Sequence, residues 1–417
     1  MIRVLGCLAS KPPALAHLPR SFTRSCTRAM TISVPPYLAD GKPQFIDIGI
    51  NLADPIFRGV YHGQQRHSDD LSAVIQRAVD TGCQKLIITG SDFASIRDAG
   101  AISKQYSGTV FRTAGIHPCS SAIFASGTGK NDGGHTPACG PDPTQEEDVE
   151  AVPDSERTVT VMAELKALID ESSSDKGLVA FGEFGLDYDR LHYCNKAVQL
   201  HSFDAQLELA ACMKPQLPLF LHSRAAHRDF VDLLKKHYGP RLEKLEKGGV
   251  VHSFTGTIEE MTELMDLGLY IGVNGCSLKT SENCEAVKAI SLDRIMLETD
   301  GPWCEVRPSH EGWKHLVPAN EVERPKADAE ASGANAKAPV KKKNQAKKPE
   351  PKIAEPTDEY KVVKKEKWVK GCMVKGRNEP CMIGRVATIV AGIKGITVEE
   401  LCKHAWENTT KVFGVVE

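Results

Sequence analysis

The sequence predicts an α/β protein built as a (β/α)8 TIM barrel that carries two disordered surface insertions. Eight short apolar runs rich in β-branched residues alternate with segments of helical period, the pattern of a parallel sheet whose strands are joined by helices. Eight strands close such a sheet into a barrel. Several of the runs end in His, Asp or Glu, and the active residues of these barrels collect at the carboxyl ends of the strands.

Each expected strand is a short apolar run bounded by turn residues. The first, 45–51, alternates in polarity, and the fourth runs from Leu178 to a carboxylate at Glu183, which sits between two glycines. The expected strands cover 45–51, 85–90, 110–118, 178–183, 217–222, 249–252, 270–274 and 295–300.

Helices are expected where apolar residues recur every three to four positions behind a capping residue. Asp69 precedes the first helix and Gly82 ends it, while Thr397 and Glu400 have the spacing of a capping box before the last. The expected helices cover 71–81, 91–105, 159–170, 195–212, 225–238, 258–267, 285–290, 382–393 and 398–413.

The barrel domain is expected to span 43–417, behind a basic extension, 1–42. The first 39 residues contain five Lys or Arg and no acidic residue, a composition typical of a mitochondrial transit peptide. The alternatives are a basic arm, or translation from Met30, with the protein in the cytoplasm or nucleus.

Two stretches interrupt the barrel pattern. Residues 126–157 are rich in Gly, Pro and acidic residues, and residues 319–375 are rich in Lys, Pro and Ala. Neither composition can bury much apolar surface, so both are expected to be disordered insertions on the surface. The lysine runs of the second have two interpretations, a solvated linker or a segment that contacts nucleic acid.

Composition limits the compartment and the partners. The formal net charge is -2, so the whole chain is not a polyelectrolyte. No run reaches the roughly 18 apolar residues of a membrane span, so we expect a soluble protein without a membrane partner. The thirteen cysteines show no CxxC spacing, which favours reduced thiols in an intracellular compartment.

Four residues at expected strand ends predict a metal centre. Strands four, five, six and eight end at Glu183, His222, His252 and Asp300, and strand three ends near His117. Carboxylate and imidazole ligands suit Mg²⁺, Mn²⁺ or Zn²⁺. Oxygen ligands with retained waters favour Mg²⁺, whereas two imidazoles favour Mn²⁺ or Zn²⁺. Because such a metal activates water and polarises a phosphoryl or carbonyl oxygen, the residues indicate metal-assisted hydrolysis.

At this point the sequence resembles the TatD family of metal-dependent deoxyribonucleases, which belongs to the amidohydrolase-like barrels. The resemblance covers about 45–414 apart from the two insertions. It is carried by FIDIGINL at 45–52, AGIHP at 114–118, GEFGLD at 182–187, LHSR at 221–224, VHSFTG at 251–256, LETD at 297–300 and RNEP at 377–380.

The resemblance implies that Glu183, His222, His252 and Asp300 bind a divalent metal, most simply Mg²⁺. It also implies that Asp300 orients or deprotonates the attacking water. Many relatives carry His-x-His on strand one. Here those positions are Gly49 and Asn51. The resemblance therefore does not imply the second metal that the His pair helps to bind. Asn51 remains a candidate to supply a ligand oxygen or to contact the substrate.

Three further residues are candidates for substrate binding. Arg224 has the planar fork that suits phosphate, although a structural ion pair is its alternative. His117 is either a substrate contact or a hydrogen-bonded core residue. Trp303, just beyond Asp300, is placed to stack on a base or to pack in the wall.

Three functions compete. The resemblance implies a nuclease that removes nucleotides 3′ to 5′ from single-stranded DNA, with Glu183 and Asp300 as catalytic residues. The second is a barrel hydrolase acting on an ester, amide or lactone, because a fold does not determine a reaction. Strand four ends in Glu183 instead of the carboxylated lysine of many such relatives. The third is a binding protein acting through its lysine-rich insertion, against which the complete ligand set argues.

Overall fold

The computed structural model describes residues 37–39, 41–126, 151–172, 175–316 and 359–415. The expected N-terminal extension lies almost entirely outside these residues, so targeting to mitochondria stays a prediction. The same holds for most of both insertions.

Eight parallel strands form one sheet, as predicted. Their bounds are β3 Phe45–Ile50, β6 Cys83–Ile88, β7 Val110–Ala114, β10 Leu178–Asp187, β11 Leu219–Arg224, β12 Gly249–Val251, β13 Tyr270–Val273 and β14 Ile295–Leu297. Each strand pairs with the next in the chain, so the order along the sheet is the order in sequence. That order is the one produced by repeated strand–helix units.

The first strand meets the residues that follow the last strand, which nearly closes the barrel. The amide of Asp300 donates to the carbonyl of Gly49 at 2.8 Å, and the amide of Asn51 donates to the carbonyl of Gly301 at 2.8 Å. The carboxylate of Asp47 also accepts the amide of Thr299 at 3.0 Å. Closure therefore joins segments about 250 residues apart and brings Asp300 beside the end of β3.

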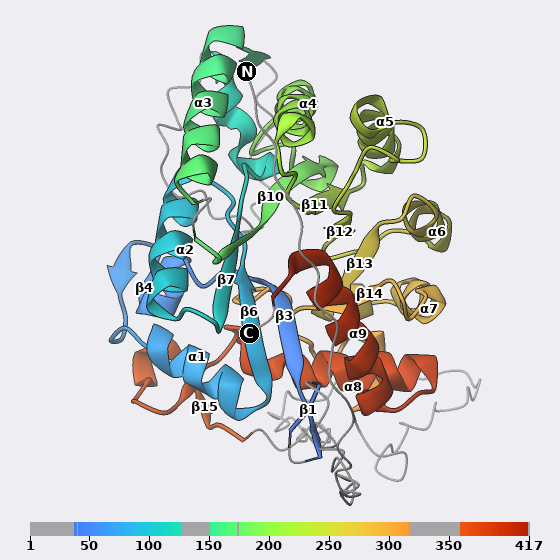
Figure 1. Cartoon of the computed structure of the whole chain (residues 1–417). Coiled ribbons are helices and arrows are strands. Elements are labelled where there is room, and N and C mark those ends of the chain that lie inside the picture. The colour runs from blue at the N-terminus through green and yellow to red at the C-terminus, as the bar shows by residue number, and fades with distance from the viewer. Residues whose placement is uncertain (1–36, 40, 127–150, 173–174, 317–358, 416–417) are drawn as a thin grey trace, which may run out of the picture. The chain divides into compact units, whose positions relative to one another are not determined.

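Nine α-helices accompany the described strands, and Figure 1 shows them around the outside of the sheet. Their bounds are α1 Leu71–Asp80, α2 Phe93–Gln105, α3 Ser155–Glu171, α4 Lys196–Cys212, α5 His227–Tyr238, α6 Ile258–Asp266, α7 Ser281–Ala289, α8 Ile383–Lys394 and α9 Val398–Phe413. Short two-residue strands occupy the loops: β1 Leu38–Ala39, β2 Lys42–Pro43, β4 Val60–Tyr61, β5 Gln64–Gln65, β8 Ala125–Ser126, β9 Val152–Pro153, β15 Val362–Val363 and β16 Met373–Val374.

The core has two parts because the strands are apolar on both faces, as expected for a sheet covered by helices. The larger part lies between the strands and the surrounding helices. The smaller one contains Ile46, Ile48 and Phe220 from the strands, together with Val412 and Phe413 from the end of α9. Alternate strand residues thus fill the barrel, and α9 contributes to that filling.

Several element boundaries differ from the prediction. Strand β10 continues to Asp187, so Glu183 lies within a strand instead of at its end, and β11 likewise continues past His222. Strand β14 stops at Leu297, three residues before Asp300. Helix α3 begins at Ser155, where the side chain of Asp154 caps it. The polarity pattern does not reveal these bounds, because both faces of each strand are buried.

The second insertion is shorter than predicted. Within its predicted range, residues 359–375 form β15, β16 and a short 3-10 helix, and Met373 and Val374 are buried. The indole of Trp368 stacks on the ring of His67 with centroids 4.8 Å apart. The prediction of disorder was therefore wrong for 359–375, because a few apolar residues find partners on the loop after β3.

Within the described part of the chain, no single helix has the length and apolar character of a membrane span. The segment Pro380–Lys394 and helix α9 meet that criterion only as a pair, across a bend of 109°.

Candidate metal centre

Glu183 projects from a bulge in β10. The register with β11 pairs Gly182 with Phe220 and then Phe184 with Leu221, so Glu183 has no partner in the ladder. A bulge of this kind re-aims a side chain. Gly182 has a φ of 147°, and a Cβ there would collide with the carbonyl of Phe220. The glycine before Glu183 is therefore required by the close approach of β11.

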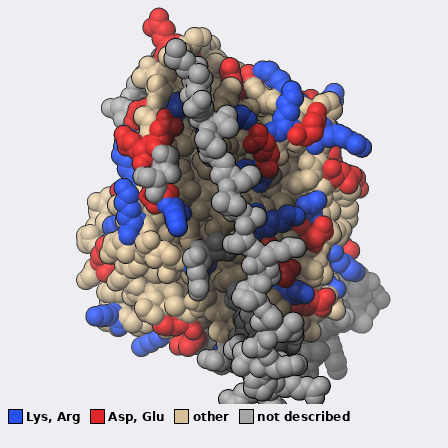
Figure 2. Space-filling view, in the orientation of Figure 1, with Lys and Arg blue, Asp and Glu red and all other residues tan. Residues whose placement is uncertain are grey.

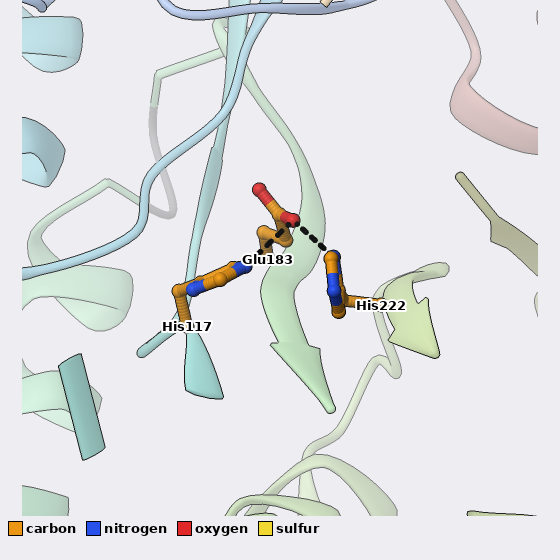
Figure 3. A group of neighbouring side chains, drawn as sticks. All are labelled: His117, Glu183 and His222. Atoms are coloured by element: carbon orange, nitrogen blue, oxygen red, sulfur yellow. Dashed lines mark hydrogen bonds and ion pairs between the residues drawn. The ribbon is translucent and has the colours of Figure 1, made fainter. Parts of the chain in front are cut away.

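Three imidazoles converge on one carboxylate oxygen of Glu183. The Oε1 atom lies 3.3 Å from Nε2 of His117, 3.0 Å from Nδ1 of His222 and 2.5 Å from Nε2 of His252. Figure 3 shows His117 and His222 on either side of Glu183. Burial disfavours the charge of this carboxylate, but His252 and His117 outweigh burial and hold the pKa of Glu183 well below its ordinary value. Glu183 is thus an ionised carboxylate within a group of imidazoles.

Two further carboxylates lie beside the histidines. Nε2 of His222 lies 3.1 Å from Oδ2 of Asp187, and Nδ1 of His252 lies 3.4 Å from Oε2 of Glu298. Burial opposes ionisation of Asp187, but the hydrogen bond with His222 outweighs it and lowers the pKa of Asp187 to about 2. Carboxylates in these positions fix the orientation and tautomer of metal-binding histidines.

Asp300 lies in the turn after β14. Its φ of 53° is left-handed, a conformation that Asp and Asn adopt more readily than most residues. Its Oδ1 accepts the side-chain amide of Asn51 at 3.0 Å, and its Oδ2 accepts the thiol of Cys304 at 3.1 Å. Burial raises the pKa of Asp300 to about 7, although His252 opposes this rise. Further positive charge near Asp300 would therefore favour its ionised form.

All eight predicted site residues line one cavity of about 460 Å³. They are Asn51, His117, Glu183, His222, Arg224, His252, Asp300 and Trp303. The structure thus brings together residues from six strands or the turns that follow them. Basic side chains of Arg190, Lys279 and Arg307 also line the cavity. Across the face drawn in Figure 2, basic and acidic side chains are interspersed.

The residues present fit a divalent cation. His117, Glu183 and His222 place ligand atoms within 4.8 Å of one another, and all three are buried. His252 lies 3.3 Å from His222 and extends this group. Carboxylate oxygens and imidazole nitrogens are ligands for Mg²⁺, Mn²⁺ and Zn²⁺. The donor set and the excess of buried carboxylate therefore favour a dication here.

The site also explains why strand one carries Gly49 and Asn51 in place of a His-x-His pair. A Cβ at Gly49 would collide with Oε2 of Glu298, so a histidine does not fit there beside that carboxylate. At the second position, the side-chain oxygen of Asn51 accepts a hydrogen bond from the hydroxyl of Thr89 at 2.6 Å. The side-chain amide nitrogen of Asn51 donates to Asp300. Asn51 is thus committed to holding Asp300.

Besides the three basic residues that line the cavity, sequence reasoning missed four residues of the site. Asp187 and Glu298 belong to motifs that were recognised, GEFGLD and LETD, but no spacing rule links either acid to a histidine. Cys276 and Cys304 were also missed, although each lies a few residues after a predicted strand end. Their relation to the site depends on side-chain direction, which the sequence does not show.

We expect Asp187→Asn to weaken metal binding by about 10–100-fold, the usual effect of losing an outer partner of a ligating histidine. The amide keeps the shape but removes the negative charge that orients His222. Calorimetric titration with Mn²⁺ measures this independently of catalysis. Asp189→Asn, two residues along and exposed, is the matched control and should bind as the parent does. Equal affinity in the two variants would contradict the role of Asp187.

Comparison with known proteins agrees with this geometry. The family model described as "TatD related DNase" matches residues 46–414. A curated relative from Schizosaccharomyces pombe, "Deoxyribonuclease Tat-D", is 40% identical over 366 residues, which cover 88% of this chain and 94% of the relative. A bacterial relative from a Pantoea strain, "3'-5' ssDNA/RNA exonuclease TatD", is 32% identical over 63% of this chain and 82% of its own.

A solved structure shares the fold. The crystal structure of an uncharacterized amidohydrolase from Saccharomyces cerevisiae superposes with a TM-score of 0.68 at 29% identity, covering 89% of this chain and 99% of that one. The family match spans the barrel strands from the second residue of β3 onward and every residue of the candidate metal centre. The chain therefore belongs to the family of TatD-related deoxyribonucleases.

Proposed function

We propose that this protein is a metal-dependent 3′–5′ exonuclease that hydrolyses phosphodiester bonds at the ends of single-stranded DNA. The observation that carries the proposal is the convergence of Glu183, His222, His252 and Asp300 on one cavity that Arg224 also lines. The printed name of the bacterial relative supports the polarity and the single-stranded substrate. The cavity has the volume of a pocket for one small ligand, which suits a terminal nucleotide.

Glu183, His222, His252 and Asp300 would hold the divalent metal, Mg²⁺ in the simplest case. When bound, such a cation lowers the pKa of a coordinated water and polarises a phosphoryl oxygen. Asp300 would accept the proton of the attacking water, and Asn51 keeps its carboxylate in place through the bond to Oδ1. Asp187 would hold His222 in orientation through their hydrogen bond, and Glu298 lies 3.4 Å from Nδ1 of His252.

The basic side chains around the cavity would bind the substrate. Arg224 ends β11, two residues after His222, and presents a planar fork that matches phosphate oxygens. Trp303 follows the Asp300 turn and lines the same cavity, where an indole can stack on a base of any type. His117 contacts Glu183 directly, so its position favours a ligand or a ligand-orienting role over a base contact.

The proposal is tested with single-stranded oligonucleotides labelled at one end, with Mg²⁺, with Mn²⁺ and with EDTA. We expect a 5′-labelled strand to shorten by one nucleotide at a time, and a 3′-labelled strand to release its labelled mononucleotide first. EDTA should abolish both reactions, and added metal should restore them. Immediate release of the 5′ nucleotide would contradict the polarity. Hydrolysis of a chromogenic ester or lactone without DNA cleavage would favour the alternative hydrolase.

We expect Arg224→Ala to raise KM at least about tenfold while kcat changes less than about threefold, because a residue that only grips phosphate contributes uniform binding. Steady-state kinetics on a short oligonucleotide separate the two constants. Arg228→Ala removes an exposed arginine four residues along and should leave both near the parent values. A fall in kcat with unchanged KM would instead place Arg224 at the transition state.

A further inference from the structure

Two cysteines meet at the wall of the metal centre. The Sγ atoms of Cys276 and Cys304 lie 2.8 Å apart, although the residues are 28 positions apart in the chain. Both line the same cavity as Asp300, so a small solute that enters the cavity reaches them. The ten described cysteines are all free thiols. This pair is therefore a reduced dithiol at the wall of the cavity, where Cys276 is buried and Cys304 is half-buried.

The backbone holds the two thiols side by side. Cys276 is the second residue of the 3-10 turn Gly275–Leu278 after β13, where its amide donates to the side chain of Asn274 at 2.8 Å. Cys304 has a left-handed φ of 54°, which is uncommon for a residue other than glycine. A Cβ at Gly275 would collide with the carbonyl of Cys304. The two turns are thus packed backbone against backbone, and the sulfur atoms need to approach by less than ~1 Å to reach a bonded distance.

The surroundings make Cys276 the more reactive thiol. A hydrogen bond from Cys304 outweighs burial and, with Lys279 and Arg224 nearby, lowers the pKa of Cys276 to about 6. Because Cys304 has one proton, it bonds to Cys276 when Cys276 is a thiolate and to Asp300 when Cys276 is a thiol. Oxidation-sensitive cysteines are typically accessible, of low pKa and placed beside a second thiol that resolves the first product. Cys276 and Cys304 satisfy this description as attacking and resolving thiols.

We propose that Cys276 and Cys304 form a reversible disulfide whose formation lowers the activity of the metal centre, an inference that rests on the proposed nuclease function for its second half. Hydrogen peroxide is the oxidant. The Cys276 thiolate takes one peroxide oxygen to become a sulfenic acid, and the other leaves as water after protonation. The sulfur of Cys304 then attacks that of Cys276, the S–O bond breaks, and the proton of Cys304 leaves with the hydroxyl as a second water.

The effect on the site follows from one hydrogen bond. While Cys276 is protonated, the thiol of Cys304 donates to Oδ2 of Asp300 at 3.1 Å, and a disulfide sulfur has no proton to donate. Oxidation also ties the turn that carries Asp300 to the turn after β13. We expect the rate of DNA cleavage to fall about tenfold, the scale of losing one hydrogen bond to a charged group.

The test uses the full chain treated with hydrogen peroxide, freed of oxidant by desalting and divided into portions with and without dithiothreitol. Free thiols are alkylated and the protein is digested with trypsin. Cleavage at Lys247, Lys279, Arg294 and Lys314 leaves Cys276 in peptide 248–279 and Cys304 in peptide 295–314, each with one cysteine. A linked pair of these two peptides therefore identifies the disulfide by mass, without reference to activity.

The proposal is supported if the oxidised parent contains the linked peptide and dithiothreitol removes it. At saturating Mg²⁺, the activity of the oxidised parent should be about tenfold lower than that of the same protein after reduction. Cys276→Ser and Cys304→Ser should each show an oxidised-to-reduced activity ratio near one. Cys212→Ser, which removes an exposed cysteine outside the cavity, should behave as the parent. Absence of the linked peptide overturns the disulfide, and a linked peptide with unchanged activity overturns its coupling to Asp300. A reduced parent without nuclease activity contradicts the proposed function, while the peptide result still decides the disulfide.

Discussion

Asp300→Asn should lower the rate of DNA cleavage at least ~10²-fold at saturating metal, the usual effect of losing an acid–base group. Asparagine keeps the volume and one side-chain oxygen, and it tolerates the left-handed φ of 53° at this position. The substitution therefore removes the charge that accepts a proton without adding backbone strain. Single-turnover cleavage of a labelled oligonucleotide measures the effect, with Mg²⁺ and Mn²⁺ each raised until the rate no longer changes.

The matched control is Asp293→Asn, which removes an exposed carboxylate at the other end of β14. It should cleave DNA within about twofold of the parent, because a surface charge far from the cavity contributes little. DNA binding by Asp300→Asn should stay close to that of the parent in a filter or anisotropy assay. Cleavage by Asp300→Asn at the parent rate would show that another group activates the water.

Arg377→Ala should cost about 3–5 kcal/mol of folding free energy, because removing one partner of a buried ionic network leaves uncompensated charge. The guanidinium of Arg377 is buried and donates to both oxygens of Asp70, at 2.9 and 2.7 Å, and to Glu379 at 2.8 Å. Arg77 reaches the same two carboxylates, at 3.5 and 2.8 Å. The network ties α1 to the segment before α8, so its loss should lower the thermal midpoint by at least about 5 °C.

Two variants control this prediction. Arg377→Lys keeps the charge but loses the paired bonds of the planar fork, so it should lie between the parent and Arg377→Ala. Arg58→Ala breaks an exposed pair with Asp69, whose atoms are 3.9 Å apart, and should cost less than about 1 kcal/mol. Differential scanning calorimetry compares the four proteins. An Arg377→Ala protein as stable as the parent would mean that Arg77 alone neutralises both carboxylates.

Much of the architecture was predictable from local pattern. The eight strands and the helices between them appear as predicted because apolar runs and capping residues act over a few positions. Thr397, for example, caps α9 by accepting the amide of Glu400, as the spacing of the two residues predicts. The bounds of β10 and β14 were wrong because pairing with neighbouring strands decides where a strand stops, and the partners are distant in sequence.

The sequence by itself determined the fold class, the family and eight of the residues that line the cavity, since each of these depends on residue type and order. Only the tertiary structure decided which groups touch: the bulge that aims Glu183, the carboxylates of Asp187 and Glu298 behind the histidines, and the thiols of Cys276 and Cys304 beside Asp300. The physical reason is that closure of the barrel joins strand ends separated by tens to hundreds of residues. Side-chain direction at those ends is set by register and backbone contact between strands, which no spacing within one strand records.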